Sequence, residues 1–179
     1  MPRPRLLPGL LIAALVAGGQ LSALATSGDG GTAGDDVTVS KPVVTRGTVS
    51  KVVDGDTIDV RMPDGAEQRI RMLGIDTPEV FGEVECGGPE ASAWTKGYLP
   101  VDTRVELVSD PSQTLKDQYG RLLRYVTKLS SGTDVNRKLV AKGWARLFVW
   151  RDDPFERVAS YRKALHRAKG AERGIWGLC

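Results

Sequence analysis

The sequence predicts an α+β fold, a small five-stranded Greek-key β-barrel with about three helices. Three observations lead to this prediction. Short segments with apolar residues at every second position, separated by Gly, Pro and Asp turns, dominate residues 47–75 and return at residues 103–129. A helical pattern interrupts them at residues 89–99, and two more helical patterns follow residue 133. This order of elements is typical of a partly open barrel of the oligonucleotide-binding type.

The first three strands are expected to form a meander. Asp54-Gly55 is a strong turn signal after the first strand, and Pro63-Asp64-Gly65 is another after the second. The third strand must bend, because strict alternation would place Arg71 and Asp76 on opposite faces. Gly74 is the position where a bulge or kink is expected. The three strands are residues 47–53, 57–62 and 67–75.

The later elements follow from capping signals and periodicity. Pro89 and Glu90 suit the first turn of a helix, and Asp134 and Gly143 suit the N-cap and the C-cap of a second helix. A third helix is predicted from apolar residues that share one face. These elements are helices at residues 89–99, 134–142 and 154–169, strands at residues 103–108 and 120–129, and a short β-prone segment at residues 144–150.

The N-terminal segment, residues 1–25, has the features of a secretory signal peptide. Two arginines precede an apolar run, and Ala23-Leu24-Ala25 is a small-x-small cleavage signal. The run is short and Gly-rich for a membrane span, although an uncleaved membrane anchor is the alternative. Residues 26–42 are predicted to be a disordered leader, so that residues 43–179 form one domain. We therefore expect a secreted protein without stable membrane association after cleavage, and nothing demands more than a monomer.

Composition sets two further limits. The formal net charge is +3 and falls to +1 without the two arginines of the signal peptide, so any attraction to nucleic acid must be local; residues 157–173 are basic. The chain has two cysteines, Cys86 and Cys179. An even count in an exported chain favours a disulfide, and two free thiols are the alternative. A cysteine nucleophile is not expected, because the only histidine, His166, lies in a basic helix.

The candidate site consists of carboxylates and arginines without a nearby histidine. Carboxylates without His or Cys suit a hard cation such as Ca²⁺ or Mg²⁺, and guanidinium groups beside such a cation suit a phosphate. The combination predicts metal-assisted hydrolysis of a phosphodiester. The site residues are Asp56 and Asp76 as metal ligands, a Thr77 carbonyl as a possible third ligand, Glu79 to orient or deprotonate the water, Arg71 and Arg121 as the phosphate clamp, and Tyr119 as a further phosphate contact.

Each of these residues also has an ordinary structural interpretation. Asp56 shares strand parity with Ile58 and Val60, which places it at the mouth of the core, but a turn aspartate that caps its own backbone is equally common. Arginines on strands usually pair with surface acids for little free energy.

Four ordered motifs resemble the staphylococcal nuclease (thermonuclease) family. They are Val53-Asp54-Gly55-Asp56-Thr57, Arg71-Met72-Leu73-Gly74-Ile75-Asp76-Thr77-Pro78-Glu79, Gly88-Pro89-Glu90-Ala91-Ser92-Ala93 and Asp117-Gln118-Tyr119-Gly120-Arg121. The resemblance extends over roughly residues 44–176. It implies a Ca²⁺-dependent nuclease that cuts DNA and RNA and leaves 3′-phosphate ends, with the roles given above for the site residues. By the same resemblance, Arg121 is the arginine closer to the leaving group.

The sequence departs from the family pattern at two places. Gln118 stands where the type member has a lysine, which removes one cation at the nucleotide phosphate. Where the type member has base-stacking tyrosines, this chain has Phe148 and Trp150, and either Trp150 or Phe148 is expected to stack a base unless both belong to the core. Two alternatives to a nuclease are a catalytically silent nucleic-acid-binding module of the same fold and a Ca²⁺-stabilised structural domain.

Overall fold

The structure is a computed structural model, and it describes residues 41–179. The predicted signal peptide and almost all of the predicted leader lie outside the described residues. The strands are β1 (Val44–Val52), β2 (Thr57–Arg61), β3 (Glu67–Met72), β4 (Ile75–Asp76), β5 (Arg104–Val108), β6 (Leu122–Lys128), β7 (Thr133–Asp134) and β8 (Arg146–Leu147). The helices are α1 (Gly88–Tyr98), α2 (Val135–Lys142), α3 (Val158–Gly170) and α4 (Ile175–Leu178).

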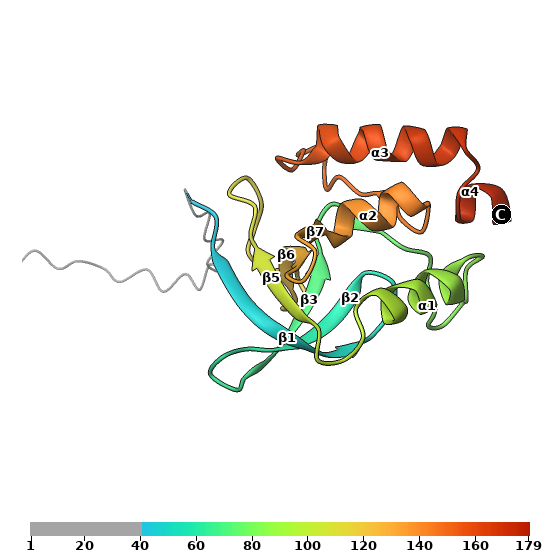
Figure 1. The fold of residues 1–179 in the computed structure, drawn as a ribbon. Coiled ribbons are helices and arrows are strands. Elements are labelled where there is room, and N and C mark those ends of the chain that lie inside the picture. Colours follow the sequence, from blue (N-terminus) through green and yellow to red (C-terminus); the bar gives the residue numbers. More distant parts are fainter. Residues whose placement is uncertain (1–40) are drawn as a thin grey trace, which may run out of the picture. The chain divides into compact units, whose positions relative to one another are not determined.

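The five longer strands form a closed barrel. They follow the order β3-β2-β1-β5-β6, and the parallel pairing of β3 with β6 closes the sheet on itself. Figure 1 shows α2 lying over the barrel and α3 lying over α2, with α1 beside the barrel. The predicted barrel with about three helices is therefore confirmed, with α4 as a short addition at the C-terminus.

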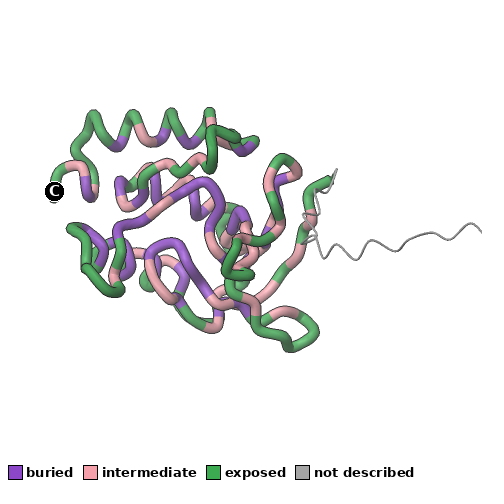
Figure 2. The backbone as a smooth tube through the Cα atoms, turned by 180° about the vertical axis from the view of Figure 1, so that it is seen from behind, coloured by how far each residue is buried: buried purple, intermediate pink, exposed green. Residues whose placement is uncertain are grey.

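The core lies inside the barrel and beneath α2. Alternate residues of the strands point inward, among them Ile58, Val60 and Ile70, and Leu139 of α2 covers them; all four are fully buried. Each such side chain stabilises the fold by about 1.5–3 kcal/mol relative to an exposed one. Figure 2 shows the buried backbone concentrated in the strands and on the inner sides of the helices.

The predicted third strand is interrupted where a bend was expected. Gly74 has a positive φ of 75°, and a Cβ atom there would overlap the ring of Phe155. Both constraints favour glycine. The interruption divides the predicted strand into β3 and β4, and β4 leaves the barrel to pair with β8.

The last predicted helix begins later than the sequence indicated. The helix α3 starts at Val158 rather than at Pro154, because residues 154–157 form an irregular segment. Phe155 is buried there, and the Glu156 amide donates to the carboxylate of Asp110 at 2.8 Å. No helix among residues 41–179 is long and apolar enough to cross a membrane.

Candidate active site

Asp56 is held at the start of β2 by the turn that precedes it. The carboxylate of Asp54 accepts hydrogen bonds from the amides of Asp56 (2.9 Å) and Thr57 (2.7 Å), and the Asp56 carbonyl accepts from the Met72 amide on β3. The turn aspartate is therefore Asp54, whereas the Asp56 side chain is turned inward and buried.

Thr77 closes the site around Asp56. Its backbone amide and its hydroxyl both donate to Oδ2 of Asp56, at 2.8 and 3.1 Å. Gly55 makes this approach possible, because a Cβ atom at that position would lie 2.6–2.8 Å from the Thr77 side chain. The bend at Gly74 thus returns the chain to the turn between β1 and β2.

Arg71 joins the two aspartates that were predicted to bind a metal. Its Nη1 lies 3.1 Å from Oδ2 of Asp56, and its Nη2 lies 2.8 Å from Oδ1 of Asp76. Nη1 also donates to the carbonyls of Met72 and Ile75. The bend expected at Gly74 therefore brings Arg71 and Asp76 to one place.

The electrostatic environment of Asp56 favours its protonated form. Burial raises the pKa of Asp56 to about 6 from its ordinary 3.8, against the lowering effect of Arg71 and with a further raising effect from Asp54 and Asp76. One guanidinium thus compensates these carboxylates incompletely.

The donor set fits a hard divalent cation. Asp56 and Asp76 supply carboxylate oxygens close to one guanidinium, and Thr77, whose amide donates to Asp56, would offer its backbone carbonyl as the third ligand. Calcium is bound by such oxygens together with water. Within residues 41–179 no three His, Cys, Asp or Glu side chains gather to hold a metal by themselves, so a cation would need the carbonyl and water as well.

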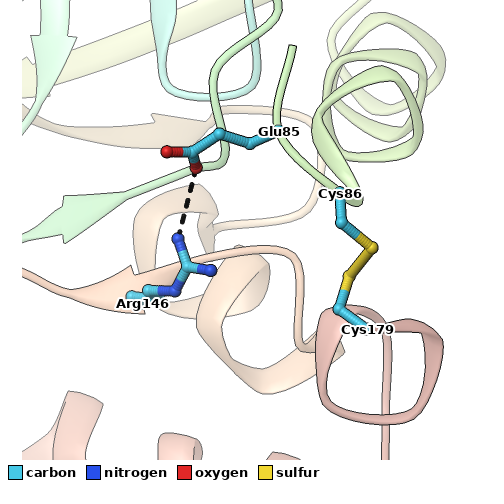
Figure 3. The surroundings of a disulfide bond; sticks show 4 residues. All are labelled: Glu85, Cys86, Arg146 and Cys179. Carbon is cyan, nitrogen blue, oxygen red and sulfur yellow. Dashed lines mark hydrogen bonds and ion pairs between the residues drawn. A yellow bond between two sulfur atoms is a disulfide. The ribbon is translucent and has the colours of Figure 1, made fainter. Parts of the chain in front are cut away.

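Glu79 is exposed and begins a segment, residues 79–87, in which residues 81–86 are also exposed. Its carbonyl accepts the Glu85 amide at 3.0 Å, which closes the segment into a loop. A disulfide between Cys86 and Cys179 then ties the end of the loop to the C-terminus, which confirms the predicted pairing. Figure 3 shows this bond beside the ion pair of Glu85 with Arg146, at 3.5 Å.

Arg121 lies at the level of Arg69, two residues before Arg71 on β3. The parallel pairing of β3 and β6 matches Ile70 with Leu122 and Arg71 with Leu123, and Arg121 directly precedes β6. The Nε of Arg121 donates to Oδ2 of Asp117 at 2.6 Å, and this contact orients the guanidinium. Arg121 lies over the ring of Tyr119, which is 73% exposed. Both residues line an open cavity of about 350 Å³ on the outer face of β2 and β3.

Trp150 and Phe148 form an exposed aromatic pair rather than part of the core. They are 55% and 43% exposed, and their ring centroids are 6.2 Å apart. The Phe148 amide donates to the Gly74 carbonyl at 3.1 Å, next to the strand that carries Asp76. The backbone of Phe148 therefore lies beside the bend between Arg71 and Asp76.

Two buried polar residues that support the site were not found from the sequence. The Asn136 side chain accepts from the Val126 amide and donates to the carbonyls of Leu73 and Arg124, at 3.0–3.1 Å. Asp110 accepts from the Tyr125 hydroxyl and from Ser112, and these hydrogen bonds lower its pKa although burial opposes the shift. In the sequence, Asn136 looks like an ordinary polar residue of a helix, and Asp110, which precedes a proline, looks like an ordinary turn residue. Neither pattern indicates a buried hydrogen-bonding role.

Fold and site together define a small barrel of the oligonucleotide-binding type with a carboxylate–arginine cluster at its surface. The family described as staphylococcal nuclease homologues matches residues 69–177. The chain is 37% identical to a thermonuclease of Staphylococcus hyicus over 132 residues, which cover 72% of this chain and 73% of that protein. It is 36% identical to a thermonuclease of Staphylococcus intermedius over 132 residues, with 72% and 74% covered.

A third relative is larger. Endonuclease YhcR of Bacillus subtilis is 33% identical over 139 residues, which cover 73% of this chain but only 11% of that protein. The chain belongs to the staphylococcal nuclease homologue family. Membership supports a nuclease, a hydrolase that acts on nucleic acids.

Proposed function

We propose that the chain is a secreted, Ca²⁺-dependent nuclease that hydrolyses phosphodiester bonds of DNA and RNA and leaves 3′-phosphate ends. The observation that carries the proposal is the single guanidinium of Arg71 that contacts both Asp56 and Asp76. One arginine only partly neutralises two carboxylates, so a divalent cation can bind there as well. The guanidinium of Arg71 then lies beside the metal site, where it suits a phosphate.

The proposed mechanism assigns one task to each side chain. Asp56 and Asp76 would hold a divalent cation, which would supply neutralisation of the charge on the phosphoryl oxygens. Glu79 accepts a proton from the attacking water as the bond between water oxygen and phosphorus forms. Arg71 and Arg121 hold the phosphoryl oxygens and stabilise the charge that develops on them.

The remaining contacts concern the nucleotide. The bond to the 5′ oxygen of the next nucleotide breaks, and this oxygen takes up a proton from solvent water. The phosphate remains on the 3′ side, and Arg121 faces the leaving oxygen. Tyr119 contacts a terminal phosphate through its hydroxyl, and Trp150 or Phe148 stacks a base, which is typically worth ~1–3 kcal/mol. The exposure of these three aromatic side chains supports the proposal.

The role of Glu79 is tested by replacing it with glutamine. Glu79→Gln removes the proton acceptor but keeps the size of the side chain, so we expect kcat to fall by about 10²–10⁴-fold at unchanged thermal stability. Glu83→Gln, in the same exposed loop, is the matched control and should keep full activity. Near-normal turnover of Glu79→Gln would remove Glu79 from the mechanism.

Export is a separate part of the proposal. We expect the protein in the culture medium to begin at Thr26, after the predicted cleavage site, and to behave as a monomer. N-terminal sequencing of the secreted protein and light scattering on the same sample measure both properties. Recovery of the intact chain in the membrane fraction would instead indicate an uncleaved anchor.

A further inference from the structure

Charge is distributed unevenly along the described chain. Residues 41–134, which carry the barrel and most of the proposed site, hold twelve Lys and Arg against fifteen Asp and Glu. Residues 135–179 hold eleven Lys and Arg against only four Asp and Glu. The positive charge therefore gathers on α2, α3 and the segments around them, and the proposed reaction does not account for it.

Part of this charge surrounds an open cavity of about 600 Å³ beside α2. Four cationic side chains line it: Arg137, Lys138, Lys142 and Arg173. Asp134, the carboxylate in the lining, is paired with Arg157 at 2.9 Å and is hydrogen-bonded by the Tyr161 hydroxyl. Asp134 is thus already compensated by groups other than the four cations.

Three of the four cations contact neutral groups rather than acids. Arg137 donates to the Ser160 hydroxyl at 3.0 Å, and Arg173 donates to the Ala141 carbonyl at 3.2 Å. Lys138 lies 5.0 Å from the ring centroid of Tyr98. Within residues 41–179 none of the four forms an ion pair with a carboxylate. Ammonium and guanidinium groups that are held apart from acids in this way suit the oxygens of phosphates.

The cavity lies away from the proposed catalytic residues. Strand β6 begins directly after Arg121, and Gly132 and Thr133 of the cavity lining follow its far end. Seven residues of strand span about 20 Å. A nucleic-acid strand in duplex form advances about 3.4 Å per nucleotide, so it covers this distance in about six nucleotides. An extended single strand covers it in fewer, but a dinucleotide is too short to reach both places.

We propose that this cavity, lined by Arg137, Lys138, Lys142 and Arg173, binds the phosphate backbone of a long nucleic-acid substrate at a distance from the bond that is cut. The inference rests on the proposed nuclease function. It makes affinity depend on substrate length, because a short oligonucleotide held at Arg71 and Arg121 gains nothing from the distant cations. The contact is electrostatic and independent of base sequence, so it weakens as salt rises.

The test uses the variant Lys138→Gln/Lys142→Gln, which removes two charges. The matched control is Lys96→Gln/Arg162→Gln, which removes two exposed charges outside the cavity, one on α1 and one on the flank of α3 turned away from Ser160. Binding of labelled single-stranded DNA of about 30 nucleotides and of a dinucleotide is measured in chelator, so that no strand is cut. Because Lys138 also packs on Tyr98, Lys142→Glu alone is the second variant.

For the long strand, we expect the slope of log affinity against log salt concentration to be shallower by about 1.4 in the cavity variant than in the wild type. The ratio of wild-type affinity to variant affinity for the long strand should therefore fall about sevenfold between about 50 and about 200 mM salt. The short strand should bind all proteins alike. Equal binding of the long strand by the cavity variants and the control, at both salt concentrations, would overturn the inference.

The outcome is separable from that of the proposed function. Suppose that the wild type releases no nucleotides with Ca²⁺, while the cavity variants bind the long strand more weakly than the wild type in chelator. This result would refute catalysis and keep the cavity as a binding site. An active wild type whose cavity variants bind and cut long DNA normally would refute the cavity alone.

Discussion

Arg71 and Arg121 are both arginines of the proposed phosphate clamp, but the protein holds them differently. Arg71 is nearly buried and contacts two carboxylates and two backbone carbonyls. Arg121 has one carboxylate partner, Asp117, and keeps more of its guanidinium exposed. Removing Arg71 therefore disturbs the whole cluster, whereas removing Arg121 takes away a group that faces the substrate.

These differences predict distinct kinetic effects. We expect Arg121→Ala to lower the single-turnover rate by about 10²–10³-fold with little change in DNA affinity, because it loses stabilisation of developing charge. Arg71→Ala should weaken both affinity and rate. Arg46→Ala, on β1 and paired with Glu106, is the control and should retain near-normal kinetics. Unchanged single-turnover rates in Arg71→Ala and Arg121→Ala would refute the clamp.

The raised pKa of Asp56 predicts a pH dependence of stability in the metal-free protein. The folded state holds this proton up to about pH 6, whereas the unfolded chain releases it near 3.8. The folded state thus binds more protons between these values, and its stability should fall as pH rises from about 4 to 6, by at most about 3 kcal/mol. Added Ca²⁺ should offset the loss at neutral pH, where the carboxylate is ionised.

Urea unfolding in chelator measures this effect as the difference between the wild type and Asp56→Asn, which keeps the shape but does not titrate. Other groups, such as Asp110 with its lowered pKa, act on both proteins and cancel in the difference. A difference that stays constant between pH 4 and 7 would show that Asp56 titrates normally.

The junction of β3, β4 and α2 depends on one buried amide. Asn136 satisfies the carbonyls of Leu73 and Arg124 and the amide of Val126, next to the bend at Gly74. Asn136→Ala takes the side-chain partner from the buried Val126 amide and Leu73 carbonyl, whereas the Arg124 carbonyl keeps the Leu73 amide, so we expect unfolding to become easier by about 2–4 kcal/mol. Urea unfolding is the measurement. Gln113→Ala, which removes an exposed amide, should cost less than about 1 kcal/mol; an equal cost for both would contradict this account.

The loop of residues 79–87 is expected to affect activity because it positions Glu79. The disulfide joins residues 93 positions apart, and the loop-entropy relation assigns it about 4–5 kcal/mol of stability. Because the Glu79 carbonyl and the Glu85 amide close the same loop, Cys86→Ser/Cys179→Ser should also loosen Glu79 and lower kcat about tenfold in protein that is still folded.

A double-mutant cycle separates positioning from general destabilisation. In the Glu79→Gln background, removal of the disulfide should cost no further activity, because the group that it positions is already absent. Ca²⁺ affinity should change little, since Asp56 and Asp76 lie outside the loop. Equal losses of activity in both backgrounds would show that the disulfide acts on stability alone.

Much of the fold was predictable because local patterns and tertiary structure agree. The alternation around Ile58 and Val60 gave the strands, Asp134 and Gly143 gave the ends of α2, and the conflict in parity between Arg71 and Asp76 located the bend at Gly74. The disulfide followed from an even cysteine count in a chain with an export signal.

The remaining features depend on contacts between distant segments. The parallel pairing of β3 with β6 joins segments that carry no common signal. Phe155 lies within a helical pattern in the sequence, but its ring packs next to Gly74, and α3 begins only at Val158. The four residues of α4 are too few for periodicity. In the site, the sequence placed the aspartates and arginines but could not show that Arg71 contacts both Asp56 and Asp76.

Nucleotide release from single-stranded DNA by the protein that begins at Thr26, in excess Ca²⁺ and in excess chelator, tests the proposed function most directly. Acid-soluble nucleotides should appear with Ca²⁺ and not with chelator, because the cluster of Asp56 and Asp76 needs a divalent cation to neutralise the phosphate. Equal release in both conditions would contradict the role given to the metal. No release in either condition, from folded protein, would leave a nucleic-acid-binding barrel without catalysis.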